Sequence, residues 1–246
     1  STSTRPDRRV SSGPVRQTAT VIPFQALLYD MDGTLVDTEP KWQAAERSLM
    51  AGFDVTWTDA DQAHCLGGST ERVTRYMADL VAATGRPRPD PAVLAQHFLD
   101  TMRSQLLADP PEPQPGVAPL LREVRESGLP TALVSSSSRP LMDAVLAAIG
   151  SQWFDVTISA DDVARHKPDP LPYLQAAAHL GVDPAWCLSI EDSPTGAASA
   201  QSAGTYVVAV EHMAVIDPAP RRTVLSTLAG VDLAALSDLF QPPPGH

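Results

Sequence analysis

The segment ALLYDMDGTLVDTEP, residues 26–40, ends an apolar run in two aspartates one residue apart and follows them with a glycine. In an extended chain, alternate residues face the same way, so Asp30 and Asp32 can both point into one site. Crowded carboxylates repel each other, and a divalent cation or a shared proton relieves that repulsion. Gly33 permits a sharp turn and leaves backbone amides open to an anion. The segment alone is equally compatible with an ordinary turn.

Three later segments carry residues that could complete a site for an anion and a metal. Ser135 and Ser136 follow an apolar run and precede a helical pattern, where hydroxyls and free amides could bind an anion. Lys167 precedes another helical pattern and is one of only two lysines in the chain. Glu191 and Asp192 end a further apolar run. Each segment has an ordinary structural explanation by itself, and only their combination indicates function.

These residues need a framework that brings them together. Short apolar runs rich in strand-forming residues are expected to be buried strands, at 26–30, 131–135, 155–159, 186–192 and 205–210. Amphipathic stretches are expected to be helices, at 116–127, 139–149, 170–180 and 194–203. This alternation predicts an α/β fold, a Rossmann-like parallel sheet with helices on both faces. The carboxyl ends of such strands form one edge of the sheet, where ligands bind.

Residues 38–110 interrupt the alternation. They show helical patterns at roughly 39–51, 59–65, 70–84 and 91–107, and the proline-rich ADPPEPQPG follows. We predict a helical cap over 38–110, inserted into a core made of 24–37 and 111–246. Residues 1–23 are rich in Ser, Thr and Arg without apolar periodicity, and we expect them to form a disordered tail.

In their order along the chain, these segments resemble the motifs of the haloacid dehalogenase superfamily. DMDGTLVDTEP resembles the first motif, Ser135 the second, Lys167 in HKPDP the third, and EDSPTG the fourth. The resemblance covers residues 25–212. The helical insert resembles the small cap of the subgroup that contains β-phosphoglucomutase, phosphoglycolate phosphatase and sugar-phosphate phosphatases. The resemblance implies a phosphoric monoester hydrolase.

The resemblance also implies a role for each acidic residue. Asp30 would be the nucleophile that forms an aspartyl-phosphate, and Asp32 the general acid and base. Mg²⁺ would bind Asp30, the backbone carbonyl of Asp32, and Asp192, while Glu191 would ligate the ion or orient a water bound to it.

The remaining motif residues would bind the phosphate. Ser135, the amides that follow it at Ser136, and the backbone at Gly33 would hold phosphoryl oxygens. Lys167 would neutralise their charge and fix the nucleophile.

A β-phosphoglucomutase-type mutase stays open as an alternative. Its cap carries a histidine where this chain has Trp42, and a lysine where it has Gly67. A mutase must hold a second phosphate, so this departure favours a phosphatase acting on a sugar or polyol phosphate. Glu39 and Arg72 are candidate substrate contacts. A catalytically silent binding or regulatory module of the same fold is the alternative from another class.

The composition bears on partners and location. A net charge of −11 disfavours a nucleic-acid partner, although the arginines of the first 20 residues leave a nucleic-acid arm open. No apolar run reaches the roughly 18 residues of a membrane span, and the first residues lack the apolar block of a signal peptide. We therefore expect a cytoplasmic monomer or small homo-oligomer whose partner is a small phosphorylated metabolite.

Overall fold

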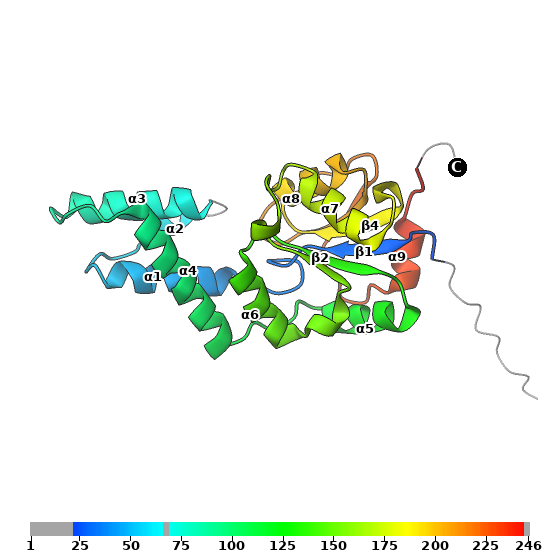
Figure 1. The fold of residues 1–246 in the computed structure, drawn as a ribbon, viewed down its shortest axis with the longest axis horizontal. Helices are drawn as coiled ribbons and strands as arrows, with labels where there is room; N and C mark the ends of the chain where they lie inside the picture. Colours follow the sequence, from blue (N-terminus) through cyan, green and yellow to red (C-terminus); the bar gives the residue numbers. More distant parts are fainter. Residues whose placement is uncertain (1–21, 66–68, 244–246) are drawn as a thin grey trace, which may run out of the picture.

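The computed structural model describes residues 22–65 and 69–243. Six parallel strands form one sheet in the order β3-β2-β1-β4-β5-β6 (Figure 1). The strands are β1 Ala26–Tyr29, β2 Thr131–Val134, β3 Val156–Ile158, β4 Cys187–Glu191, β5 Tyr206–Val210 and β6 Arg222–Leu225. The α/β class and the five expected strands are confirmed. The sixth strand was not predicted, because it lies at the sheet edge, is only half-buried, and has no continuous apolar run.

Strand β1 lies in the middle of the sheet and is buried on both faces, as a continuous apolar run requires. Leu27 and Tyr29 join one hydrophobic cluster, with α5, α6 and α9, whereas Ala26 and Leu28 join the cluster on the opposite face, with α7 and α8 (Figure 1). The helices of the core are α5 Val117–Ser127, α6 Arg139–Ile149, α7 Leu171–Leu180, α8 Pro194–Ser202 and α9 Leu233–Leu239. Three short 3-10 helices accompany them, η1 Ser151–Trp153, η2 Ala160–Asp162 and η3 Pro184–Trp186.

Several helices begin at an acidic or serine side chain followed by proline. Ser193 accepts the backbone N–H of Gly196 at the start of α8, and Asp169 accepts that of Leu171 at the start of α7. Asp183 accepts the backbone N–H of Ala185 in the same way at the start of the 3-10 helix η3. These caps fix the ends of the loops that leave the carboxyl edge of the sheet.

Residues 39–108 form four helices with no strand among those described, to one side of the sheet (Figure 1). They are α1 Glu39–Ala51, α2 Asp59–Cys65, α3 Thr70–Ala83 and α4 Pro91–Ala108. We call them the α1–α4 unit. Helix α4 packs against α1 and α3 within the unit and against α6 of the core. Trp42 packs on Phe98 with ring centroids 5.3 Å apart, which gives it a structural role.

The two chain connections to the α1–α4 unit run side by side. Val36 pairs with Pro113, and the backbone N–H of Gln114 donates to the carbonyl oxygen of Leu35 at 2.8 Å. These two contacts therefore hold the entry and the exit of the unit side by side. The role of the unit as a cap, and its limits at 38 and 110, stay predictions.

The predicted N-terminal tail falls almost entirely on residues 1–21, which lie outside the described residues. Ile22 is partly buried against the hydrophobic core. The limit between tail and core at residue 24 stays a prediction. No helix in the described part of the chain has the length and apolar character needed to cross a bilayer.

Glu46 on α1 is a buried carboxyl group within the α1–α4 unit. Its side chain is 5% exposed, and its Oε2 atom has no hydrogen-bond partner among the described residues. Burial raises the pKa of Glu46 to about 7, an effect that Gln62 and Trp57 oppose and the charge of Glu39 reinforces. The folded chain thus binds a proton at pH values where the unfolded chain has lost it.

We expect Glu46→Gln to stabilise the protein above neutral pH. Between the ordinary pKa of 4.5 and the folded value of about 7, the free energy of unfolding should fall as pH rises. The variant should match the wild type near pH 5 and exceed it by about 1 kcal/mol near pH 8, after allowance for solvent screening. Urea unfolding at both pH values measures this, with exposed Glu126→Gln as the control. An equal pH dependence in wild type and Glu46→Gln would contradict the prediction.

Candidate active site

The carboxyl ends of the central strands bring the four motif segments together. Asp30 follows β1, and its backbone N–H donates to the carbonyl oxygen of Ile190 on β4. Ser135 follows β2, and Asp192 follows β4. Lys167 enters from the loop before α7, and its Nζ donates to Asp30 Oδ1 at 2.7 Å. Residues up to 162 positions apart in the sequence, Asp30 and Asp192, therefore share one edge of the sheet, as predicted.

Lys167 is buried among oxygen atoms. Its side chain is 4% exposed, and Nζ also donates to Glu191 Oε1 at 2.6 Å and to the Val134 carbonyl oxygen at 2.9 Å. The ammonium group lies 5.0 Å from the centre of the Tyr173 ring. Burial alone would lower the pKa of Lys167, but the charges of Asp30 and Glu191 outweigh it and hold the pKa above its ordinary value. The lysine thus stays protonated and fixes both carboxylates.

Both carboxylate oxygens of Glu191 are already engaged. Oε1 accepts hydrogen bonds from Lys167 and, at 2.5 Å, from the Tyr173 hydroxyl, and Oε2 accepts one from Ser193 at 3.3 Å. A Cβ atom at Gly196 would lie 1.9 Å from Glu191 Oε1, so only glycine fits beside this carboxylate. These contacts favour the orienting role of Glu191 over direct ligation.

Asp30, Glu191 and Asp192 form an acidic cluster, with one oxygen from each lying within 4.8 Å of the others. Burial, followed by repulsion from Asp30 and Glu191, raises the pKa of Asp192 to about 8. Asp30 Oδ2 is buried and has no hydrogen-bond partner among the described residues. An orphaned carboxylate oxygen beside a second crowded carboxylate, with Lys167 as the neighbouring cation, fits a hard divalent ion such as Mg²⁺.

Gly33 allows the first-motif loop to pass directly over Asp192. Its φ angle is +87°, in the left-handed region, and a Cβ atom there would lie 2.0 Å from Asp192 Oδ2. The Thr34 hydroxyl donates to Asp192 Oδ1 at 3.3 Å. Position 33 therefore requires glycine because the loop packs directly against Asp192. This steric reason adds to the exposed amides that the sequence had suggested.

Asp32 is held by three hydroxyl groups. Thr38 donates to Oδ1 at 2.7 Å, and Ser137 and Ser135 donate to Oδ2 at 2.8 and 3.2 Å. Burial raises the pKa of Asp32, the Thr38 hydroxyl opposes the rise, and the charge of Asp30 adds to it. A carboxyl group with a raised pKa, next to Asp30, is suited to giving and taking a proton.

Thr38 and Ser137 were not predicted as site residues. The serine run and the threonine in VDTEP were visible, but nothing in their spacing showed that they converge on Asp32. The Ser135 hydroxyl also accepts the Ser137 backbone N–H at 2.9 Å, whereas Ser136 is exposed. Ser135 therefore donates a hydrogen bond to Asp32, and it also lies at the position where an anion site was predicted.

The two predicted substrate contacts of the α1–α4 unit each make a hydrogen bond within the unit. Glu39 begins α1 and accepts a hydrogen bond from Gln43 at 3.3 Å. Arg72 donates to the carbonyl oxygen of Cys65 at 3.3 Å, a contact within the unit. Neither contact involves the acidic cluster, so their roles toward a substrate stay predictions. Gly67, used in the comparison with mutases, lies outside the described residues.

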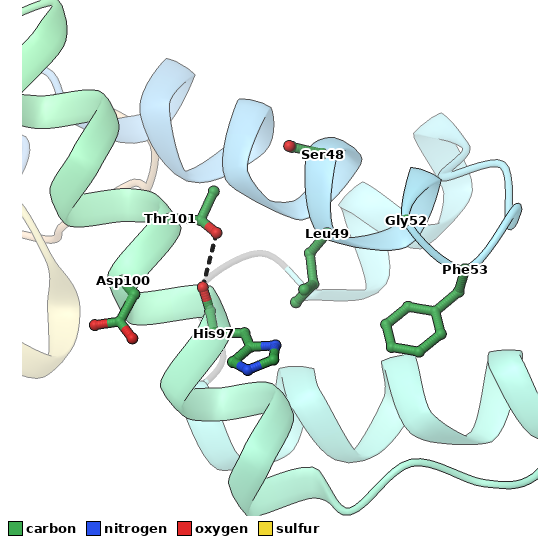
Figure 2. A pocket seen from close by; sticks show the side chains of 7 residues that line it. All are labelled: Ser48, Leu49, Gly52, Phe53, His97, Asp100 and Thr101. Atoms are coloured by element: carbon green, nitrogen blue, oxygen red, sulfur yellow. Dashed lines mark hydrogen bonds between the residues drawn. The ribbon is translucent and has the colours of Figure 1, made fainter.

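A cavity of about 440 Å³ lies between α1 and α4. Figure 2 shows Leu49 of α1, and Phe53 in the turn that follows α1, facing His97 of α4 across it. None of the motif residues lines this cavity. The motif residues therefore gather at the sheet edge and not around this cavity.

The fold and the site together define a Rossmann-like α/β protein in which a helical unit follows the first strand and acidic residues gather at the carboxyl edge of the parallel sheet. The model of the haloacid dehalogenase-like hydrolase family matches residues 27–210. This chain belongs to that family, and it is a phosphatase of the type found there, as the four motifs predicted.

Two known proteins and one solved structure are similar to this chain over most of its length. Protein CbbY of Rhodobacter capsulatus is 36% identical over 195 residues, covering 75% of this chain and 84% of that protein. Fructose-1-phosphate phosphatase YqaB of Escherichia coli K12 is 32% identical over 190 residues, covering 76% and 96%. A CbbY variant from Rhodobacter sphaeroides, crystallised with xylulose-(1,5)bisphosphate, has a TM-score of 0.72 at 27% identity, covering 87% and 99%.

Proposed function

We propose that this protein is a Mg²⁺-dependent phosphatase that hydrolyses a small sugar or polyol phosphate through an aspartyl-phosphate on Asp30. One observation carries the proposal. Asp30 has one oxygen fixed by Lys167 at 2.7 Å and the other buried without a partner among the described residues, beside Asp192. Such a carboxylate is oriented and placed to act as a nucleophile. The similarity to a fructose-1-phosphate phosphatase supports the substrate class.

The side chains divide the reaction between them. A carboxylate oxygen of Asp30 bonds to phosphorus as the bond from phosphorus to the ester oxygen breaks, and Asp32 gives that oxygen its proton. Asp32 then takes a proton from the water that hydrolyses the aspartyl-phosphate. Ser135, with the amides at Ser136 and Gly33, holds phosphoryl oxygens.

Two positive charges, the bound Mg²⁺ and Lys167, would offset the negative charge of the phosphate. Asp30, Asp192 and the backbone carbonyl of Asp32 would hold Mg²⁺, which supplies the positive charge that lets an anionic phosphate approach a carboxylate. Lys167 adds a fixed positive charge, and Glu191 holds Lys167 in place. We propose that the α1–α4 unit acts as the cap that excludes water and contacts the leaving group.

The cap favours a substrate with one phosphate. Trp42 stands where the mutase subgroup carries a histidine, and it packs on Phe98. Lys41, the sole lysine of the unit, pairs with Asp109. Because neither position offers a cation for a second phosphate, we favour a phosphatase over a β-phosphoglucomutase-type mutase.

Phosphate release across about fifty phosphate esters, with Mg²⁺ and with EDTA, tests the proposal. We expect release from sugar or polyol monophosphates, loss of release in EDTA, and recovery when Mg²⁺ is added back. The panel should include xylulose 1,5-bisphosphate and β-glucose 1-phosphate. Conversion of β-glucose 1-phosphate to the 6-phosphate would support a mutase, and persistence of hydrolysis in EDTA would exclude the metal. No activity on any ester would favour the catalytically silent module.

Asp32→Asn should slow turnover by about 10²- to 10⁴-fold, because an amide cannot move the proton. Asn keeps the shape and can still accept the Thr38 hydroxyl, so folding should be retained. Steady-state kcat with the best ester measures the effect. Ser137→Ala is the companion variant: it removes one donor to Asp32 and should cost much less. An unchanged kcat in Asp32→Asn would remove the acid–base role.

A further inference from the structure

His212 lies beside the acidic cluster, in the loop after β5, and the motifs do not include it. Its Nδ1 is 3.5 Å from Asp192 Oδ2, and its Nε2 is 3.7 Å from Asp37 Oδ1. Nδ1 is buried and has no hydrogen-bond partner among the described residues. Both separations exceed a hydrogen bond but lie within the range of an ion pair. The imidazole therefore stands between two carboxylates from different parts of the chain.

The carboxylate on the far side belongs to the start of the α1–α4 unit. Asp37 Oδ1 accepts the backbone N–H of Glu39, the first residue of α1, at 3.2 Å. Asp37 follows Val36, which pairs with Pro113 of the other connection. The oxygen near His212 Nε2 is therefore the same oxygen that accepts the backbone N–H of the first residue of α1.

The first-motif loop restricts the imidazole from a third direction. A Cβ atom at Gly33 would lie 3.1 Å from His212 Nδ1 and 2.0 Å from Asp192 Oδ2. The loop, the imidazole and the carboxylate are thus in mutual contact, and the His212 side chain is only 20% exposed. A ring confined in this way has little freedom to turn its Nδ1 away from Asp192.

We propose that His212 is a positioning residue that holds the carboxylate of Asp192 through Nδ1 and links it through Nε2 to Asp37 at the start of α1. The inference rests on the proposed function, which assigns Asp192 to the Mg²⁺ site. Through this link, the arrangement of the metal ligand and the position of the α1–α4 unit depend on each other.

The two nitrogens can be tested separately. Asn places an amide near the position of Nδ1, whereas Gln places one near that of Nε2. Mg²⁺ affinity, measured by calorimetry on the full chain without substrate, reports on the Asp192 side. Hydrogen exchange of residues 37–42, with and without Mg²⁺, reports on the Asp37 side. His179→Ala on α7 serves as the control, because that histidine is exposed.

His212→Ala should weaken Mg²⁺ binding by about 10-fold or more, the loss typical when a residue that orients a ligand is removed. His212→Asn should recover most of the affinity, and His212→Gln should recover only the Mg²⁺-dependent protection of 37–42. Asp37→Asn combined with His212→Ala should give non-additive effects on affinity. Should His212→Ala not fold, the Asn and Gln variants carry the test.

The outcomes separate the two proposals. If the wild type binds Mg²⁺ and hydrolyses esters, while all His212 variants bind Mg²⁺ within twofold of it, the inference is overturned and the proposed function stands. If the wild type does not bind Mg²⁺, both are overturned.

Discussion

Asp30→Asn should abolish turnover while leaving the protein folded. The amide is a far weaker nucleophile than the carboxylate, so we expect a loss of at least about 10³-fold in kcat. Folding should survive because Lys167 keeps its hydrogen bonds to Glu191 and to the Val134 carbonyl oxygen. The substitution also removes one of the crowded charges. Phosphate release and thermal unfolding, measured on the same preparation, test both halves of the expectation.

Asp143→Asn provides the matched control for Asp30→Asn. Asp143 is exposed on α6, so the same chemical change there should leave both turnover and stability close to those of the wild type. Retention of even a tenth of wild-type turnover in Asp30→Asn would exclude the covalent mechanism. The fold and the acidic cluster would then need a different chemical explanation.

Lys167→Met should cost both stability and activity. Removing the ammonium group leaves Asp30 and Glu191 buried without their counter-charge, and breaking a buried ion pair costs about 3 to 5 kcal/mol. We expect the free energy of unfolding to fall by about 3 kcal/mol near pH 8 and turnover to be lost. Urea unfolding and phosphate release measure the two effects.

The pH dependence of Lys167→Met follows from Glu191. Burial, reinforced by Asp30, already raises the pKa of Glu191, and Lys167 opposes that rise. Without the lysine, the folded chain should bind a proton at pH values where the unfolded chain has lost it. Stability should therefore recover as pH falls toward the ordinary value of 4.5.

Lys41→Met is the control for Lys167→Met. It separates the general effect of losing a lysine from the effect of losing a buried ion pair. Lys41 pairs with Asp109, whose side chain is 82% exposed, so the pair should contribute less than about 1 kcal/mol. The chain has no other lysine, which makes the comparison complete. Equal losses of stability in the two variants would show that the burial of Lys167 has no energetic consequence.

The central strands were predicted well from the sequence, because a strand buried on both faces has an unbroken run of apolar residues. The prediction missed β6 and α9, which lie at the margin of the sheet and bury fewer side chains. The order of the strands and motif segments along the chain was sufficient to predict one shared edge of the sheet for the motif residues, because the carboxyl ends of parallel strands lie at the same edge. These residues are Asp30, Ser135, Lys167 and Asp192.

The finer contacts of the site could not be predicted from spacing. The hydroxyl of Tyr173 reaches Glu191 across 18 positions, and that of Ser137 reaches Asp32 across 105. Such pairs depend on how helices and loops pack on the sheet. The periodicity of the sequence does not indicate that packing. His212 follows an ordinary strand and carries no motif, so its place beside Asp192 emerged only from the structure.

The paired connections at Val36 and Pro113 give the protein a modular design. Because the chain leaves the core and returns to it at neighbouring points, the four helices between them could be lengthened, exchanged or replaced without changing the register of any strand. A change within these helices would then leave Asp30, Ser135 and Asp192 in their places at the strand ends. The length of the insertion also matters little to the entropy of closing the chain at these points, because that entropy grows only with the logarithm of loop length.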